Sequence, residues 1–200
     1  MPQHTTNRIT PKKFLLPLIA VTCALLIAGC SKSGGNHLHV KSAAAGEKEV
    51  DVKSSFTYPV TKTFTDINQK ITTAATYNVY TANYDLDSAN FAQTLQKPLT
   101  ADDQVRVEFS LVGEEGTKEN SALKAGTYSA KADKYMKVEA VGIATRKGGS
   151  DNKVWLDRST LTGEVKVTSV SDDSISGDID VTAGDASIKG AFTAKILKRK

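Results

Sequence analysis

Cysteine and histidine are scarce in this sequence, and their positions exclude several kinds of site. Cys23 and Cys30 are the only two cysteines, so no thiol lies beyond residue 30. This excludes a disulfide framework, a thiolate zinc site and a cysteine nucleophile from any domain that follows. Beyond residue 50 there is no histidine either, which excludes Ser-His-Asp and Cys-His arrangements there. Such a domain must be stabilised by ordinary burial of apolar side chains.

Glycine-rich nucleotide motifs are also absent. The sequence has no G-x-x-x-x-G-K-[ST] pattern and no strand–glycine–helix fingerprint of a dinucleotide site. Acid–base catalysis by carboxylates needs two acids that converge in a desolvated pocket, and no spacing in this chain predicts one. We therefore predict that the protein is not an enzyme and has no catalytic residue, cofactor or metal site. A carboxylate-based hydrolase is the less favoured alternative.

An excess of basic charge is largely confined to the start of the chain. The full sequence carries 26 basic and 22 acidic residues, a net charge of +4. Arg8, Lys12 and Lys13 precede an apolar run, and no acidic residue accompanies them. If this segment is removed, 23 basic residues remain against 22 acids, and the net charge is only +1. Nucleic acid is therefore not an expected partner.

The apolar run itself is short. Phe14–Gly29 is sixteen residues long, carries no charge and contains Pro17. A membrane-spanning helix needs about 20 apolar residues, and an internal proline would cost it a hydrogen bond. The run therefore predicts the apolar core of a secretory signal, with a basic leader before it and small residues at its exit.

The exit reads Ile27-Ala28-Gly29-Cys30, an aliphatic residue and two small residues before a cysteine. This pattern resembles the lipobox of bacterial lipoproteins, and the resemblance covers residues 1–30. It implies that residues 1–29 are a cleaved signal peptide, that the Cys30 thiol receives a diacylglycerol, and that fatty acids such as palmitate hold the protein to the cell envelope. Serine at position 31, rather than aspartate, implies the outer membrane rather than the inner one. Residues 50–200 resemble no family.

Composition changes after the cysteine. Residues 31–49 are rich in glycine, serine, alanine and scattered charge, which is typical of a flexible tether. We expect residues 30–49 to contain the lipidated cysteine and this tether, and residues 50–200 to form a single β-rich domain. Residues 50–60, 71–84 and 105–111 have the alternation or the threonine, tyrosine and valine content of strands.

The clearest strands lie at the end of the chain. Three apolar stripes are separated by the turns "VSDDS" and "AGDAS", and they predict a three-strand antiparallel meander. Gly163, Gly177 and Gly190 recur at matching positions, where we expect them on the inward face. About eight strands are expected in all, and they favour an all-β fold, either an antiparallel β-sandwich or an up-and-down β-barrel.

Two local signals complete the expected fold. In "DSANFAQTLQKP", Asp87 or Ser88 is a candidate cap and Pro98 a stop, which allows at most one short helix. In "TRKGGSDNK", the pair Gly148-Gly149 predicts a hairpin tip. The small residues Ala140 and Gly142 are also expected on the inward face. Together with Gly163, Gly177 and Gly190, they favour a barrel whose interior is not completely filled by side chains.

Several polar and aromatic residues are candidates for binding. His37 and His39 form an H-x-H pair, but in a tether no rigid surroundings would orient them on a metal. The acids Glu164, Asp178 and Asp180 would share a sheet face, but their spacing matches no calcium loop. We interpret both groups as solvated side chains.

The aromatic residues also allow both a binding and a purely structural interpretation. Tyr80 and Tyr84 would be able to flank a groove for sugar or peptide, but we favour the simpler interpretation that the tyrosines border a β core with their hydroxyls in water. Trp155 is expected to anchor the core.

These observations predict a lipid-anchored protein of the cell envelope. Its partner is the membrane, through the lipid on Cys30, with a second envelope protein as a further possible partner. The expected role is that of a binding or structural module. A small-ligand carrier with a barrel cavity is the main alternative.

Overall fold

Residues 36–198 are described by a computed structural model, in which almost all regular structure is strand. The strands are β1 (His37–Ser42), β2 (Gly46–Asp51), β3 (Ser54–Thr65), β4 (Ile71–Ala82), β5 (Val105–Val112), β6 (Gly126–Ser129), β7 (Lys137–Lys147), β8 (Ser150–Trp155), β9 (Thr162–Val170), β10 (Ser174–Ala183) and β11 (Ala186–Ile196). One 3₁₀ turn, η1 (Ser88–Asn90), leads into the single short helix α1 (Phe91–Gln96). None of the helical segments in this part of the chain has the length and hydropathy to cross a membrane.

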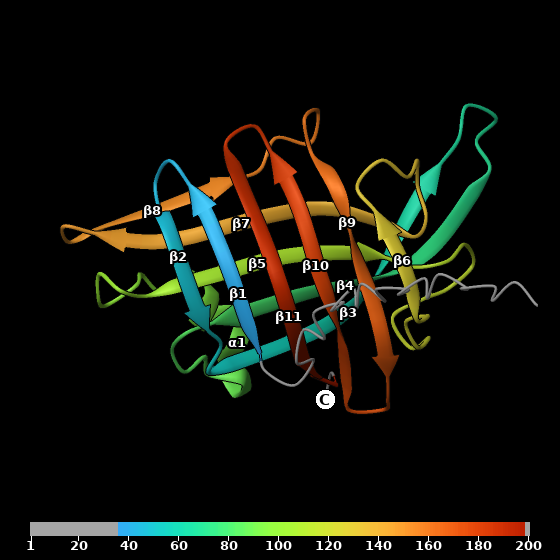
Figure 1. Cartoon of the computed structure of the whole chain (residues 1–200). Coiled ribbons are helices and arrows are strands. Elements are labelled where there is room, and N and C mark those ends of the chain that lie inside the picture. The colour runs from blue at the N-terminus through green and yellow to red at the C-terminus, as the bar shows by residue number, and fades with distance from the viewer. Residues whose placement is uncertain (1–35, 199–200) are drawn as a thin grey trace, which may run out of the picture. The chain divides into compact units, whose positions relative to one another are not determined.

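Eight of the strands close into a barrel. The order around it is β3-β4-β5-β7-β6-β9-β10-β11, and β11 returns to β3. Strands β1 and β2 extend the sheet beyond β11, and β8 extends it beyond β7. In Figure 1 the layer made of β2, β1, β11, β10 and β9 runs across a second layer made of β8, β7, β5, β4 and β3. The all-β prediction is confirmed.

The order departs from a simple up-and-down barrel at two places. β6 lies beside β7 in parallel and beside β9 in antiparallel orientation, and β11 meets β3 in parallel. Both parallel contacts are short: β6 and β7 share the one pair Ser129–Lys137, and β11 and β3 share two pairs. The barrel is therefore closed by long antiparallel ladders and by two brief seams.

The expected C-terminal meander is present. β10 pairs along its length with both β9 and β11. Gly163, Gly177 and Gly190 pair with the inward residues Val181, Val167 and Ile179, so all three have inward register positions, and Gly163, near the start of β9, is exposed to solvent. A Cβ atom at Gly163 would lie 2.0 Å from the carbonyl oxygen of Asp180. The glycines thus allow neighbouring backbones to approach closely, which explains the repeated pattern.

Side chains fill the middle of the barrel. The inward residues of β5 are Val105, Val107, Phe109 and Leu111, all at most 2% exposed. Phe109 meets Phe192 of β11 across the barrel, with ring centroids 5.1 Å apart in an edge-to-face arrangement. An eight-stranded barrel is just wide enough for side chains to fill its interior, and this one is filled at that level.

The expected boundary between a flexible tether and the β domain at residue 50 is wrong. The part of the expected tether that the structure describes belongs to the sheet. Residues 37–49 form β1 and most of β2, which pair with each other and with β11. Leu38 and Val40 alternate with polar residues along β1, and both are fully buried in the main core. This two-residue period, and not the glycine and serine content, determines the local structure.

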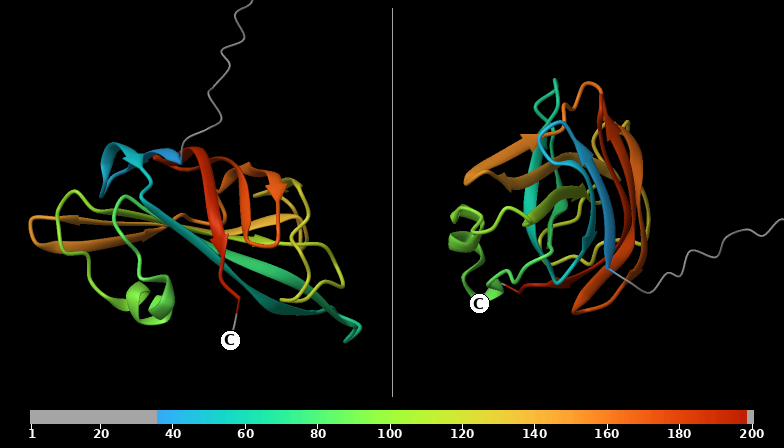
Figure 2. Two further views of the ribbon diagram at one scale, coloured as in Figure 1. Left: turned by 90° about the horizontal axis from the view of Figure 1, so that it is seen from below. Right: turned by 60° about the vertical axis from the view of Figure 1, so that its left-hand side comes forward.

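A second, smaller apolar cluster lies outside the barrel. Phe56, Tyr58 and Tyr80 project from the outer side of β3 and β4, and Phe91 and Leu95 of α1 cover them. The Asp87 carboxylate caps η1 by accepting from the amides of Ala89 and Asn90, as expected from the sequence. In the right-hand view of Figure 2, α1 lies on the side of the barrel away from β9 and β10, and the end of β11 runs towards it.

Three expectations about side-chain direction were wrong. Trp155 is not a core anchor, because it lies on the outer face of β8 with 54% of its surface exposed. Ala140 and Gly142 also face outward, since they pair with the outward residues Ser110 and Glu108 of β5. Gly142 in turn pairs with Trp155, whose ring lies against it. The absence of a side chain at Gly142 therefore leaves space for the Trp155 ring on the outer face and does not enlarge the interior of the barrel.

Candidate functional site

A cavity opens where β11 separates from β3, and we call it the seam cavity. The two strands pair only at Lys195–Phe56 and Ile196–Thr57. Beyond these pairs lies a space of about 390 Å³. It is lined by Pro59, Tyr77, Glu119, Asn120, Ser121, Ala122, Ser171, Asp172, Ile196, Leu197 and Lys198. Pockets that bind small molecules typically occupy about 300–1,000 Å³, so the space suits a small ligand.

The wall formed by residues 119–122 is held at two points. The Tyr77 hydroxyl, on the inward side of β4, donates to the carbonyl of Ser121 at 2.9 Å. The amide of Glu119 donates to the Thr61 hydroxyl of β3 at 3.0 Å. Burial raises the pKa of Tyr77, so its hydroxyl stays a neutral donor. The loop is therefore positioned by β3 and β4, which also provide the floor.

The opposite wall comes from the end of β11. The amide of Ile196 donates to the carbonyl of Asp173 at 2.7 Å, and the amide of Leu197 donates to the carbonyl of Thr57 at 2.8 Å. These bonds connect the β9–β10 turn to β3 through the last residues of β11. The lining of the cavity thus combines apolar side chains, such as Pro59 and Ile196, with charged ones, such as Glu119, Asp172 and Lys198. The arrangement fits an amphipathic molecule.

A buried charged group lies on the outer face of β5. Arg106 and Glu108 are each only 5% exposed. The Arg106 Nε atom donates to Glu108 Oε1 at 3.1 Å, and Lys153 Nζ donates to Glu108 Oε2 at 2.9 Å. Two cations therefore share one carboxylate. Pairing of this kind is what makes burial of charge tolerable, because an unpaired charge there would cost several kcal/mol.

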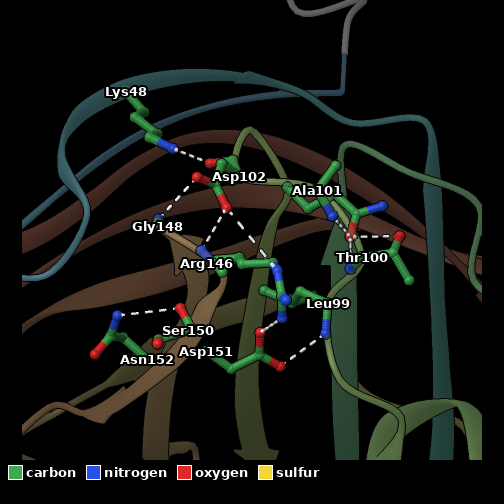
Figure 3. A network of polar contacts seen from close by, with 12 residues as sticks. Lys48, Leu99, Thr100, Ala101, Asp102, Arg146, Gly148, Ser150, Asp151 and Asn152 are labelled. Carbon is green, nitrogen blue, oxygen red and sulfur yellow. Dashed lines mark hydrogen bonds and ion pairs between the residues drawn. The ribbon is translucent and has the colours of Figure 1, made fainter.

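A second polar network fixes the β7–β8 hairpin and the loop beside it (Figure 3). Asp102 accepts from the amide of Gly148 at 2.7 Å. Asp151 accepts from the amide of Leu99 at 2.7 Å and from Arg146 Nη1 at 2.6 Å. These hydrogen bonds, that from Leu99 first, hold the pKa of Asp151 below its ordinary value. The hairpin that carries Trp155 is therefore held in place by residues 99–102.

The histidine pair lies in the fold and not in a tether. His37 and His39 share one face of β1, opposite the acids of β2. The ring nitrogens of His37 lie 2.8 Å from Asp51 Oδ1 and 2.6 Å from Glu49 Oε2. His39 Nδ1 lies 2.8 Å from Glu49 Oε1. The two rings therefore have the rigid surroundings that the sequence interpretation denied them.

The candidate carboxylates of the meander alternate with lysines. Asp180 stands directly opposite Glu164, as expected, but Lys189 Nζ lies 3.2 Å from Asp180 Oδ2. Asp178 stands opposite Lys166. Within residues 36–198, no group of three or more His, Cys, Asp or Glu side chains has positions that would hold a metal ion.

The candidate tyrosines do not flank one groove. Tyr80 stacks on Tyr58, with ring centroids 5.9 Å apart and planes 10° apart, within the outer apolar cluster. The Tyr84 hydroxyl accepts from Arg106 Nη1 at 3.3 Å. Cys30 and Ser31, on which the lipid anchor depends, lie outside the described residues.

Sequence reasoning missed the seam cavity, because its lining comes from segments that are far apart in the chain. No family model, no curated protein and no solved structure matches this chain. What the fold defines is the class: a closed eight-stranded β-barrel, compatible with a binding or carrier module.

Proposed function

We propose that this protein is a lipid-anchored binding protein of the bacterial cell envelope that holds a small amphipathic ligand in the seam cavity. The observation that carries the binding part is the cavity itself, a space of about 390 Å³ that both apolar and charged side chains line. The middle of the barrel is filled by Phe109, Phe192 and their neighbours. The proposed site is therefore at the seam and not in a deep central cavity.

The proposed anchor is the lipid on Cys30. The signal-like run and the Ile27-Ala28-Gly29-Cys30 sequence support it, and Ser31 supports residence at the outer membrane. The described fold begins at Asn36, only six residues after Cys30. Six residues reach at most about 20 Å when fully extended. An anchored domain would stay close to the bilayer surface, where amphipathic molecules concentrate.

We also propose a binding role rather than catalysis. The carboxyl groups of Asp151 and Asp157 accept hydrogen bonds, mainly from backbone amides, that lower their pKa values and keep them ionised. A carboxyl that acts as a general acid needs its pKa raised instead. These two carboxyl groups are therefore not candidate general acids, and the prediction that the protein is not an enzyme stays a prediction.

The cavity is tested by filling it in the full chain. Ala122 is an exposed lining residue, so Ala122→Trp would occupy the cavity without disturbing the core. The matched control is Ala125→Trp, because Ala125 is exposed on the same loop but is not a lining residue. The probe is N-phenyl-1-naphthylamine, whose fluorescence rises in apolar surroundings, with laurate as competitor.

The expected result is saturable probe binding that laurate reverses, lost in Ala122→Trp and retained in Ala125→Trp. Equal binding by both variants would place the probe elsewhere and contradict the proposed site. Failure of the unaltered protein to bind either molecule would contradict the ligand class.

A further inference from the structure

A hollow of about 260 Å³ lies on the outer face of β5, and we call it the outer hollow. Its lining combines the end of α1 and the segment that follows with side chains of β5, β7 and β8. These lining residues are Leu95, Lys97, Pro98, Leu99, Arg106, Ala144, Asp151, Asn152 and Lys153. Three of them are cations and one is an acid, so the charge of the lining favours an anionic group.

Arg106 is the most buried cation of this lining. Its side chain is only 6% exposed, whereas that of Lys153 is 40% exposed. Its Nε atom donates to Glu108, its Nη1 atom to the Tyr84 hydroxyl and its Nη2 atom to the carbonyl of Leu95. These bonds use three of the five N–H donors of a guanidinium. The other two are held in a fixed orientation before any ligand arrives, which lowers the entropic cost of binding.

Two lysines complete the cationic part of the lining. Lys153 Nζ donates to Glu108 Oε2 at 2.9 Å and lies 4.4 Å from the centroid of the Trp155 ring. These two contacts fix the ammonium group and leave one of its three N–H donors for a ligand. Lys97 is exposed and directly follows α1. The three cations therefore reach the outer hollow from three separate parts of the fold, which are β5, β8 and the segment after α1.

The carboxylates beside the outer hollow are already engaged. Asp151, the one acid of the lining, accepts from the amide of Leu99 with one oxygen and from Arg146 with the other (Figure 3). Glu108, behind the lining, is shared by two of its cations. The lining itself has three cations against one acid, an excess of two positive charges. Arg146 and Glu108, each bonded to a lining residue, cancel one another, so the excess remains.

We infer that the outer hollow binds a phosphate group, either as the free ion or as part of a small phosphomonoester, with Arg106, Lys153 and Lys97 as its donors. A phosphomonoester carries a charge of about −1.5 to −2 at pH 7, which matches the excess of two, whereas a carboxylate would neutralise only one charge. Guanidinium and ammonium groups are also the side chains with which proteins most often bind phosphate.

The size of the outer hollow limits the ligand further. Its volume of about 260 Å³ lies just below the range of about 300–1,000 Å³ that is typical of ligand pockets. The molecule that carries the phosphate group must therefore be small. This inference does not depend on the seam cavity, with which the outer hollow shares no lining residue.

Calorimetric titration of the full chain in a phosphate-free buffer tests the inference. The probes are glycerol 3-phosphate and inorganic phosphate, and the tighter of the two identifies the source of the phosphate group. Glycerate is the matched carboxylate of similar size, titrated at equal ionic strength. The expected result is saturable binding of a phosphate compound, with at least about tenfold weaker binding of glycerate, as expected for loss of a charge-assisted hydrogen bond.

Surface variants locate the binding at the outer hollow. Lys97→Ala removes an exposed cation of the lining, and we expect about tenfold weaker binding of the phosphate compound. Lys97→Arg keeps the charge and should retain most of the affinity. The control is Lys131→Ala, because Lys131 is exposed and is not part of the lining. Both lysines are on the surface, so these variants should fold, which circular dichroism would establish.

A third variant tests the buried donor without changing the net charge. The double substitution Arg106→Met, Glu108→Leu removes Arg106 together with its carboxylate, so no buried charge is left unpaired. We expect this variant to fold and to lose phosphate binding, because the two ordered donors of the guanidinium are gone. Retention of full affinity would contradict the role of Arg106.

Three further results would overturn the inference. The first is equal affinity for glycerol 3-phosphate, inorganic phosphate and glycerate. The second is the absence of saturable binding by either phosphate compound. The third is an equal loss of affinity in Lys97→Ala and Lys131→Ala, which would mean that binding follows the overall charge of the protein and not the outer hollow.

Discussion

The two faces of β5 differ in a way that the sequence pattern does not indicate. Inward, Val107, Phe109 and Leu111 are at most 2% exposed and fill the barrel. Outward, Arg106 and Glu108 are also only 5% exposed, because Lys153, Tyr84 and the segment that contains α1 lie over them. One strand therefore has an apolar buried face and a charged buried face. Alternation identifies the first, but it predicts a solvated surface for the second.

The difference between the two faces of β5 indicates where hollows for a ligand form in this fold. The apolar face forms one packed core with the other strands, which makes the barrel stable. The charged face is covered by irregular segments that leave hollows between their side chains. Two variants test this comparison directly and two further measurements test other outward-facing groups, in order of decreasing expected effect.

The apolar face is tested by Phe109→Ala. This variant removes the ring that meets Phe192 across the barrel and leaves a cavity. We expect a loss of about 3–5 kcal/mol in the free energy of unfolding, measured by urea denaturation of the full chain. Phe109→Leu is the control and should lose much less. A loss below about 1 kcal/mol in Phe109→Ala would mean that the interior is not packed as described.

The charged face is tested by Glu108→Ala. Arg106 would remain buried without its carboxylate, and we expect a loss of about 3 kcal/mol in the same measurement. By comparison, Asp180→Ala breaks only the exposed pair with Lys189 and should have no measurable effect. The double variant Arg106→Met, Glu108→Leu should recover most of the loss, because no buried charge is left unpaired. Equal effects of Glu108→Ala and Asp180→Ala would contradict the burial of this face.

The seating of Trp155 is tested by Gly142→Ala. The new methyl group would meet the indole ring, which is exposed and able to move outward. We expect the free energy of unfolding to change by less than about 1 kcal/mol, while the tryptophan emission shifts to longer wavelength. Gly163→Ala is the contrasting variant, because there the methyl group would meet the backbone of Asp180. An unchanged emission spectrum in Gly142→Ala would show that the ring does not lie on residue 142.

The smallest effect is expected at His37. The hydrogen bonds that His37 donates to Asp51, and then to Glu49, raise its pKa above the ordinary value of 6.5. Protonated His37 therefore stabilises the β1–β2 pairing fully below about pH 6.5, and this contribution is lost as pH rises through the raised pKa. An NMR titration should show that Asp51→Asn lowers the pKa of His37, whereas Asp178→Asn does not. An unchanged pKa in Asp51→Asn would mean that the pair does not form.

Sequence reasoning was most successful where structure depends on neighbours in the chain. The meander β9–β11, the Gly148-Gly149 turn and the helix that follows Asp87 were all predicted correctly, because turn and cap residues act locally. The start of the domain was placed too late, because composition was given more weight than the alternation of Leu38 and Val40.

The sites were the least predictable part, for a physical reason. The seam cavity joins β3 and β4 to residues 119–122 and to the end of β11. The outer hollow joins residues 95–99 to β5, β7 and β8. Their positions follow from which strands are neighbours, and the two parallel seams are not encoded by any local pattern. The residues next to Trp155 in the sequence do not indicate whether its ring is buried or exposed. Its outward position becomes clear only from its pairing with Gly142 on β7, against which the ring lies.

The central proposal, a binding protein held at the envelope by lipid, is tested most directly by the intact mass of the protein extracted from bacterial membranes. We predict a chain that begins at Cys30 and carries the added mass of a diacylglyceryl group and an amide-linked fatty acid. Cys30→Ser should lack this addition. A precursor of residues 1–200 without added mass, or an unmodified protein recovered in the aqueous fraction, would contradict the proposal.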